Sequence, residues 1–293
     1  MTEFLAPDTV EAAIAALAGD DEAVAVGGAT ALSLMMKEGL LFPSRLVWLG
    51  RIPGWDSITA APGMVRIGAG VTLADLAGSE SVRRALPAVA AAAGTAANPR
   101  VRSVATVGGH LAHADPRQDL PPVLLAAGAV ALVSGPGGDR RVPVDDLLVG
   151  FYETSLAAAE VITAVEVPLT PGSRQVYARF NPGSADDYPT VGIAVHVELG
   201  PDDTVASVRV AAGGCASRAV LLHEAAAVIR GRSPSALDLP AVQAAVEAEI
   251  PVVGDHRGAE SYKRRVAGVW ARRAVAGAVG DAGPLLGQPV AVV

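Results

Sequence analysis

The sequence predicts an α+β protein built from two domains. Up to residue 167, short apolar runs of strand length alternate with helical segments. This pattern breaks at Pro168–Ser173, where two prolines and a glycine interrupt it. Beyond the break, strand-like runs come first and three helical segments come last. A chain of 293 residues also has the usual length for two domains of about 100–200 residues each.

The first elements are a helix, then a strand that runs through a double glycine into a second helix. Asp8 and Glu11 have the spacing of a capping box and predict the start of the first helix, whose apolar stripe reaches Leu17. We expect a strand at Ala23–Val26 and a helix at Ala29–Glu38, with the double glycine between them.

The remaining elements follow from the same patterns. Apolar or alternating runs predict strands at Arg45–Leu49, Val65–Gly68, Ala129–Val133, Arg140–Val144, Val161–Val167, Gln175–Phe180, Val191–Glu198 and Val205–Ala211. Helical spacing predicts helices from Thr72 onward and over Val82–Ala93, Leu120–Ala127, Ser217–Arg230, Leu239–Ala248 and Gly258–Gly280. Glycine-rich turns at 135–139 and 200–203 predict two β-hairpins.

Composition and charge exclude several classes of protein. A net charge of −7 argues against a nucleic-acid binder, which normally carries a basic excess. The single cysteine, Cys215, cannot form an internal disulfide or ligate an iron–sulfur cluster alone. We expect a cytoplasmic protein without a signal peptide or membrane span. The last helix has a basic face that we interpret as solvated, formed by Lys263, Arg264, Arg265, Arg272 and Arg273.

Two double-glycine segments are the strongest candidates for a binding site. They are Gly27-Gly28, followed by a helix, and Gly108-Gly109, preceded by Thr106. Such turns allow positive φ angles and offer consecutive N–H groups to an anion such as a diphosphate. The start of the following helix adds a partial positive charge. Each pair alone is more often a simple tight turn than a binding site.

Other candidate residues have plain structural explanations. Asp119 precedes a predicted helix and suits an N-cap, although its carboxylate could also accept from sugar hydroxyls. His110 and His113 lie three residues apart, but no third metal ligand accompanies them, so we expect no metal site. No pattern pairs a nucleophile with a base, and we assign no catalytic residue.

Taken in order along the chain, these segments resemble a known family. Ala25–Leu32 is similar to the A-G-G-x-S/T-L loop of the FAD-binding medium subunits of molybdenum hydroxylases, the carbon monoxide dehydrogenase and xanthine dehydrogenase family. Thr106–Leu111 resembles their T-I/V-G-G-N-L loop, and Ala114–Leu125 resembles the segment that follows it. The resemblance continues through 135–139, 160–163, 177–180, 185–192 and 208–214.

The resemblance implies a fold and a set of cofactor contacts. The family fold is a two-subdomain FAD-binding domain like that of vanillyl-alcohol oxidase, here 1–172 with subdomains of about 1–55 and 56–172. A smaller α+β domain, here 173–293, follows it. The implied contacts with non-covalent FAD are Gly27, Gly28, Ala29, Thr30, Ala31, Leu32, Thr106, Gly108, Gly109, His110, Asp119, Ile162 near the adenine, Arg179, and Asp187 and Tyr188 near the isoalloxazine.

The implied function is electron transfer within a larger enzyme. The flavin would receive electrons from a small iron–sulfur subunit with [2Fe-2S] clusters and pass them to an external acceptor. The molybdenum cofactor would sit on a large molybdopterin subunit, and the complex would be a heterotrimer or a dimer of heterotrimers. The sequence departs from the family pattern at Ala105, where glycine is usual, and at His110, which replaces asparagine; Arg179 stands where lysine is frequent.

Two alternatives stay open at this point. One is a self-sufficient oxidase or dehydrogenase of the vanillyl-alcohol-oxidase type, in which His110 or Cys215 would tether the flavin. The other is a subunit that binds no flavin and serves as an assembly or interaction module. Intact mass and the colour of the purified protein distinguish the three interpretations.

Overall fold

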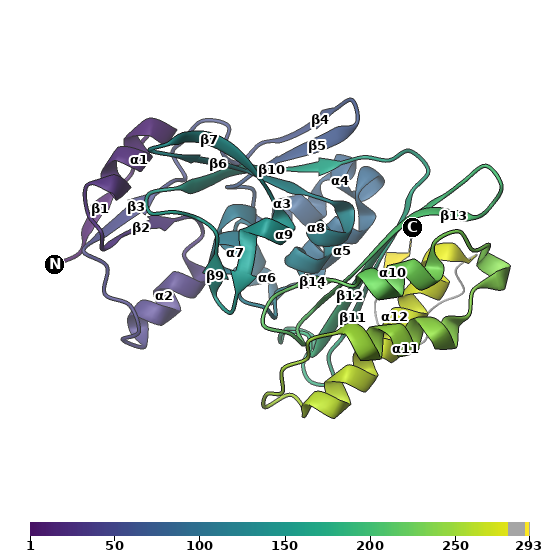
Figure 1. Cartoon of the computed structure of the whole chain (residues 1–293). Coiled ribbons are helices and arrows are strands. Elements are labelled where there is room, and N and C mark those ends of the chain that lie inside the picture. The colour runs from purple at the N-terminus through teal and green to yellow at the C-terminus, as the bar shows by residue number, and fades with distance from the viewer. Residues whose placement is uncertain (281–290, 293) are drawn as a thin grey trace.

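The computed structural model describes residues 1–280 and 291–292 and confirms the α+β fold (Figure 1). A three-stranded sheet lies near the N-terminus, and a five-stranded sheet follows it. A second five-stranded sheet lies in the C-terminal part, together with a long final helix. The three-stranded sheet and the first five-stranded sheet therefore come first in the chain, and the second five-stranded sheet with its helices comes last.

The N-terminal sheet is parallel and has the strand order β1-β3-β2. Parallel neighbours need crossover connections, which two helices supply here. The elements are β1 (Glu3–Leu5), α1 (Val10–Ala18), β2 (Ala23–Val26), α2 (Thr30–Lys37) and β3 (Arg45–Trp48). The predicted capping box was wrong, because Thr9 is the N-cap residue and its side chain accepts the N–H of Ala12 at 3.1 Å.

The middle sheet is antiparallel, with the order β4-β5-β10-β6-β7. Its strands are β4 (Ile58–Ala61), β5 (Met64–Gly68), β6 (Val130–Gly135), β7 (Gly138–Pro143) and β10 (Val161–Pro168). Its helices are α3 (Leu73–Gly78), α4 (Glu80–Ala85), α5 (Pro87–Thr95), α6 (Pro99–Arg102), α7 (Val107–His113), α8 (Leu120–Ala127) and α9 (Val144–Leu147). A small hairpin joins β8 (Leu148–Gly150) to β9 (Glu153–Thr154). The single helix predicted over Val82–Ala93 is two helices, because Pro87 lacks the N–H that would continue α4.

The C-terminal sheet has the order β14-β13-β12-β11-β15. Its strands are β11 (Arg174–Phe180), β12 (Val191–Leu199), β13 (Val205–Gly213), β14 (Val220–Leu221) and β15 (Ala291–Val292). The helices are α10 (His223–Ile229), α11 (Leu239–Glu249) and α12 (Glu260–Val279), with a 3₁₀ turn at Pro234–Ala236. The helix predicted over Ser217–Arg230 begins later, because Val220–Leu221 pairs with β13.

Helices α5 and α8 lie between the two five-stranded sheets (Figure 1). They contact β11–β13 on one face of the C-terminal sheet, while α12 covers β11 and β12 on the other face. Two hydrophobic cores result, one beneath the middle sheet and one between the C-terminal sheet and α10–α12. We propose the domain boundaries 1–172 and 173–293, with subdomains of about 1–55 and 56–172, because the three larger sheets divide there.

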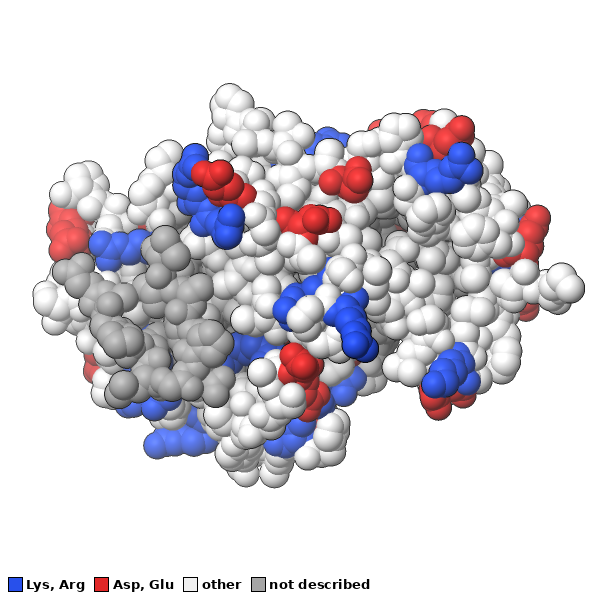
Figure 2. Space-filling view, turned by 180° about the vertical axis from the view of Figure 1, so that it is seen from behind, with Lys and Arg blue, Asp and Glu red and all other residues white. Residues whose placement is uncertain are grey.

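The predicted basic face of α12 is not a single solvated face. The Lys263 side chain is only 1% exposed, and its Nζ lies 2.8 Å from Asp255 Oδ1. Arg264 donates to the carbonyl oxygens of Glu247 and Ile250. Figure 2 shows basic and acidic side chains interspersed over the face turned away in Figure 1. Within the described ranges, no helix has the length and apolar character needed to cross a membrane.

Candidate functional site: a cleft between two double-glycine segments

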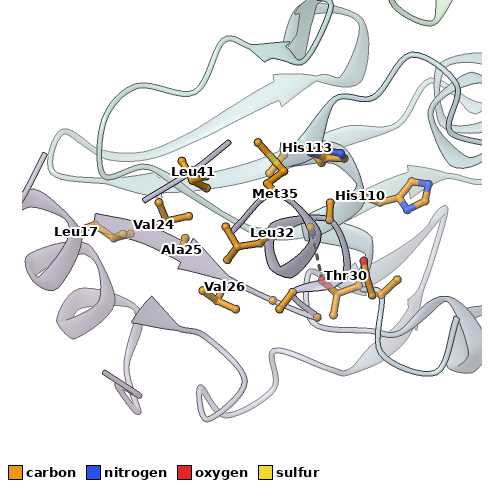
Figure 3. A pocket seen from close by; sticks show the side chains of 18 of the residues that line it. Leu17, Val24, Ala25, Val26, Thr30, Leu32, Met35, Leu41, His110 and His113 are labelled. Atoms are coloured by element: carbon orange, nitrogen blue, oxygen red, sulfur yellow. Dashed lines mark hydrogen bonds between the residues drawn. The ribbon is translucent and has the colours of Figure 1, made fainter. Parts of the chain in front are cut away.

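A cleft of about 400 Å³ opens between the β2–α2 segment and α7 (Figure 3). This volume lies within the usual range for small-molecule sites. Both double-glycine segments contribute to its walls, although 80 residues separate them in the chain, as the numbers of Gly28 and Gly108 show. Gly27–Leu32 line one wall, and Thr106, Gly109 and His110 line the other. The structure thus brings together two segments that the sequence analysis could single out only separately.

The first pair of glycines permits close packing of the two segments. A Cβ atom on Gly28 would lie 1.7 Å from the carbonyl oxygen of Val104, and one on Gly27 would lie 2.5 Å from Thr106 Oγ1. Neither glycine has a positive φ; the left-handed residue is Ala29, with φ 56°. These glycines therefore do not use the positive φ that such turns allow; what excludes a side chain there is the contact with the second segment.

The second pair of glycines lies within a helix. Thr106 is the N-cap of α7, and its hydroxyl accepts the N–H of Gly109 at 3.2 Å. Gly108 packs against Ala69, the residue just after β5. A Cβ atom on Gly108 would lie 2.6 Å from the Cβ atom of Ala69. Gly109 is exposed toward the cleft. The predicted turn is thus the first turn of a helix, in which Gly108 allows close packing against Ala69.

The N-terminus of α2 presents free donors to the cleft. Its N-cap, Ala29, has no side chain that could accept a hydrogen bond, and the first bond back to it comes from the Ser33 N–H at 2.8 Å. The N–H groups of Thr30, Ala31 and Leu32 have no acceptor within the helix. Such a terminus carries a partial positive charge and suits an anion.

Two buried polar atoms at the cleft have no hydrogen-bond partner among the residues that the structure describes. They are Nε2 of His110 and Oε1 of Gln118. Burial, with a smaller contribution from nearby His113, lowers the pKa of His110 to about 4, so the imidazole is neutral at pH 7. Neutral imidazole and carboxamide groups are suited to donate to and accept from a polar ligand. Buried groups of this kind are normally paired, and a bound ligand would pair them.

The ionisable side chains that line the cleft are His110, His113 and Glu160. Glu160 is held by Arg140, whose Nε and Nη2 each donate to its carboxylate at 2.7 Å. No lysine or arginine belongs to the described lining, so an anion in the cleft would be bound by backbone N–H groups and helix ends.

A polar cluster connects the cleft to the C-terminal domain. Asp115 is buried and accepts from Arg117 Nε at 3.0 Å and from the Tyr152 hydroxyl at 2.9 Å. Burial raises the pKa of Asp115, but the hydrogen bonds from Arg117 and Tyr152 outweigh burial and bring it below the usual value. The rings of Tyr152 and His113 lie 4.9 Å apart. The cluster therefore extends from the cleft wall at His113 outward to Arg117.

Asp187 and Tyr188 lie beyond this cluster and do not line the cleft. The Arg117 guanidinium lies 5.2 Å from the centre of the Tyr188 ring, and that of Arg257 lies 5.8 Å from it. Arg257 Nη2 also donates to Asp187 Oδ1 at 2.6 Å. Burial raises the pKa of Tyr188 to about 12. Both predicted residues thus contact arginine side chains outside the described cleft lining.

Asp119 and Arg179 form a buried ion pair between the two domains. Arg179 Nε lies 2.8 Å from Asp119 Oδ1, and the Tyr177 hydroxyl donates to the same oxygen at 2.7 Å. Burial raises the pKa of Asp119, whereas Arg179 and Tyr177 act in the opposite direction. Asp119 occupies the N-cap position of α8, as predicted, but its side chain makes no capping hydrogen bond and pairs with Arg179 and Tyr177 instead. Neither residue lines the described cleft.

Ile162 lines a smaller apolar recess of about 70 Å³ that adjoins the cleft. Trp55 and Leu156 also line this recess, and Gly27, Thr106 and Gly109 belong to both cavities. Sequence reasoning missed several lining residues: Met35, Leu41, Trp55, Gln118 and Glu160. The position of Met35 one helical turn after Ala31 could have indicated its place, whereas the other four required the fold.

The described residues contain no group of His, Cys, Asp and Glu that could hold a metal ion. The cleft combines apolar walls, free N–H groups and unpaired polar atoms without a nucleophile next to a base. Such a site binds an elongated, partly anionic ligand, and the chemistry would come from that ligand.

The chain is a subunit of FAD-containing oxidoreductases, as two family models that together match nearly all of it show. Residues 1–170 match the family described as FAD binding domain in molybdopterin dehydrogenase, and residues 177–278 match the CO dehydrogenase flavoprotein C-terminal domain. The chain belongs to the family of FAD-binding medium subunits of molybdenum hydroxylases, as the resemblance predicted.

Named relatives support this membership over nearly the whole chain. The carbon monoxide dehydrogenase medium chain of Hydrogenophaga pseudoflava is 34% identical over 279 residues, which cover 93% of this chain and 95% of that protein. The nicotine 6-hydroxylase medium subunit of Paenarthrobacter nicotinovorans is 32% identical, with coverage of 93% and 95%. A solved carbon monoxide dehydrogenase from Hydrogenophaga pseudoflava superposes with a TM-score of 0.90 at 32% identity, covering 95% of this chain and 96% of that chain.

Proposed function

We propose that the chain binds FAD non-covalently in the cleft and relays electrons through it. Electrons would come from a small iron–sulfur subunit with [2Fe-2S] clusters and pass to an external acceptor. The observation that carries the proposal is the meeting of both double-glycine segments at the uncapped start of α2. The diphosphate would accept hydrogen bonds from the backbone N–H groups of Thr30, Ala31 and Leu32. The two walls would stay close enough to hold it because of the small or close-packed residues Gly27, Gly28, Thr106, Gly108 and Gly109.

The remaining contacts follow the shape of the cleft. His110 Nε2 and Gln118 Oε1 would pair with sugar or ribityl groups, because both are buried there without a partner. Ile162 and the apolar recess would receive the adenine end. The isoalloxazine would lie toward His113, Asp187 and Tyr188. FAD, when bound, supplies the exchange of one or two electrons, and the chain supplies binding and orientation. Asp119 and Arg179 would act by holding the C-terminal domain against this site.

Exposed apolar residues support a place in a larger complex. Phe4, Leu34, Leu40, Phe42, Val149 and Phe151 are all at least half exposed. Exposed apolar side chains mark an interaction surface where they form a contiguous patch. We propose that the partners are the small iron–sulfur subunit and a large molybdopterin subunit that carries the molybdenum cofactor, in a heterotrimer or a dimer of heterotrimers. The relatives act on different substrates, so the substrate depends on that large subunit.

A covalent flavin is the second candidate, and of the two residues suggested for the tether only His110 lines the cleft. Cys215 is 1% exposed, lies in the core of the C-terminal domain and does not line the cleft, so it cannot tether a flavin there. His110 lines the cleft and keeps Nε2 free. A tether at His110 would leave flavin attached to the chain after denaturation.

The electron path is tested with the complex isolated together with its partners. Reduction by substrate should bleach the flavin absorption only when the iron–sulfur subunit is present. If substrate reduces the flavin equally well without that subunit, the relay is wrong and the flavin reacts directly.

A further inference from the structure

Helix α2 carries many apolar residues but buries none of them. It contains Leu32, Leu34, Met35 and Met36 within Thr30–Lys37, and every residue of the helix is at least partly exposed. Helices this short are marginal in water unless packing supports them. In Figure 1, α2 stands apart from the helices beneath the middle sheet. The rest of the chain therefore stabilises this helix little by packing.

The two sides of α2 differ in what they face. Leu32 and Met35 point into the cleft, and Leu41, just after the helix, lines it as well (Figure 3). Leu34 lies outside the cleft lining and is 58% exposed. The inner side of α2 thus forms an apolar wall of the cleft.

The backbone on both sides of α2 has left-handed residues, whereas the glycine before it packs closely on the second segment. Gly28 is fixed by its contact with the Val104 backbone. The next residue, Ala29, has φ 56°, and Gly39 after the helix has φ 70°. Both are in the left-handed region that only glycine adopts freely. Helix α2 thus lies between two left-handed positions, whereas β2 and the glycine contact lie before the first of them.

We propose that residues 29–41 form a flap that closes over the bound cofactor. The inference rests on the proposed FAD site. The first turn of α2 binds the diphosphate through its N–H groups, and Leu32, Met35 and Leu41 then pack on the cofactor. Binding thereby supplies the contacts that α2 lacks, so the flap is ordered by the same ligand that it encloses.

Cleavage by a lysine-specific protease measures how often the flap opens, because the chain has few lysines. The chain has two lysines, Lys37 at the end of α2 and Lys263, which is 1% exposed. A lysine-specific protease can therefore cut the folded chain at a single accessible lysine, within the proposed flap. Proteolysis of native proteins requires local opening, so the cutting rate reports how often the flap opens. Lys37→Arg abolishes this cut and confirms its position.

The experiment follows cleavage of the full-length chain with and without FAD, and measures FAD binding separately by equilibrium dialysis. We expect FAD to slow the cut at Lys37 at least about tenfold, as an opening equilibrium coupled to a ligand at ten times its Kd requires. AMP, which lacks the isoalloxazine and the diphosphate, serves as the control nucleotide and should protect less.

A matched pair of variants separates the inner side from the outer side. Leu32→Ser should weaken FAD binding about tenfold, the effect of losing roughly half the transfer free energy of a buried leucine. Leu34→Ser changes the same residue type on the same helix and should leave FAD affinity within about twofold.

The possible outcomes distinguish the flap from the FAD site. Binding with slowed cleavage, and a loss of affinity confined to Leu32→Ser, supports the flap. FAD binding without slower cleavage at Lys37 overturns the flap and leaves the FAD site intact. Equal losses of FAD affinity in Leu32→Ser and Leu34→Ser do the same. Dialysis without any FAD binding overturns both the flap and the FAD site.

Discussion

The buried Asp119–Arg179 pair gives the sharpest prediction for how the two domains are joined. The side chains are 3% and 6% exposed, and Nε and Oδ1 are 2.8 Å apart. Arg179 also donates to the carbonyl oxygens of Ala185 and Asp187. One guanidinium therefore connects α8 of the first domain with the loop that carries Tyr188.

Removing this guanidinium should be costly because it leaves Asp119 buried without a counter-charge. Arg179→Met should lower the free energy of unfolding by about 3–5 kcal/mol, the usual cost of breaking a buried pair. Arg179→Lys keeps the charge but cannot reach both carbonyls and Asp119 together. Its cost should be only about 1–2 kcal/mol, since each lost hydrogen bond contributes about 0.5–1.5 kcal/mol.

The assay is urea unfolding of the full-length chain, followed by far-UV circular dichroism. Glu80→Gln is a suitable control, because the Glu80–Arg84 pair is exposed on both sides and should contribute less than about 1 kcal/mol. The reasoning is refuted if Arg179→Met costs less than about 1 kcal/mol, or if Arg179→Lys is as damaging as Arg179→Met.

Three further predictions concern the cleft. The folded-state pKa of His110 is about 4 against an ordinary value of 6.5, so unfolding takes up a proton between these values. Stability from this group is fully present above pH 6.5 and is lost as the pH falls toward 4; from pH 7 to 4.5, wild type should lose about 2 kcal/mol more than His110→Gln, measured by urea unfolding at both pH values. Equal losses in both proteins would show that His110 is not buried in its neutral form. Gly28→Ala should displace the two walls, because its Cβ would meet the Val104 carbonyl, and should lower both Tm and FAD affinity, whereas Gly137→Ala has open space and should change neither. Unchanged FAD affinity in Gly28→Ala would contradict the close approach of the walls. Gln118→Leu removes an unpaired buried oxygen, so it should keep or raise the Tm while it weakens FAD binding; unchanged binding would remove Gln118 from the site.

Much of the fold could be predicted from the sequence because the local signals were strong. The strand at Ala23–Val26 and helix α8 at Leu120–Ala127 have the predicted bounds, and both glycine-rich hairpins form as expected. The errors occurred where local signals competed. Pro87 divides a continuous alanine-rich run into two helices, and Val220–Leu221 joins a sheet because β13 offers a free edge. Pairing partners of that kind are set by tertiary structure and leave no local trace.

Part of the candidate site could likewise be predicted from local sequence signals, and part depends on the fold. Gly27, Gly28, Thr106 and Gly109 could be found because double glycines are conspicuous, but their φ angles and the contact of Gly28 with Val104 depend on the fold. The pairing of Asp119 with Arg179 joins residues 60 positions apart. A sequence read one segment at a time favours the local explanation, an N-cap, over such a distant partner.

The measurement that tests the central claim most directly is the visible spectrum of the purified protein before and after acid precipitation. A cleft that binds FAD without a covalent bond predicts a flavin spectrum in the folded protein and full release of FAD into the acid supernatant, with one FAD per chain. Flavin that stays with the pellet would contradict non-covalent binding and indicate a tether at His110. A folded protein that shows no flavin, even after FAD is added, would contradict the cofactor assignment itself.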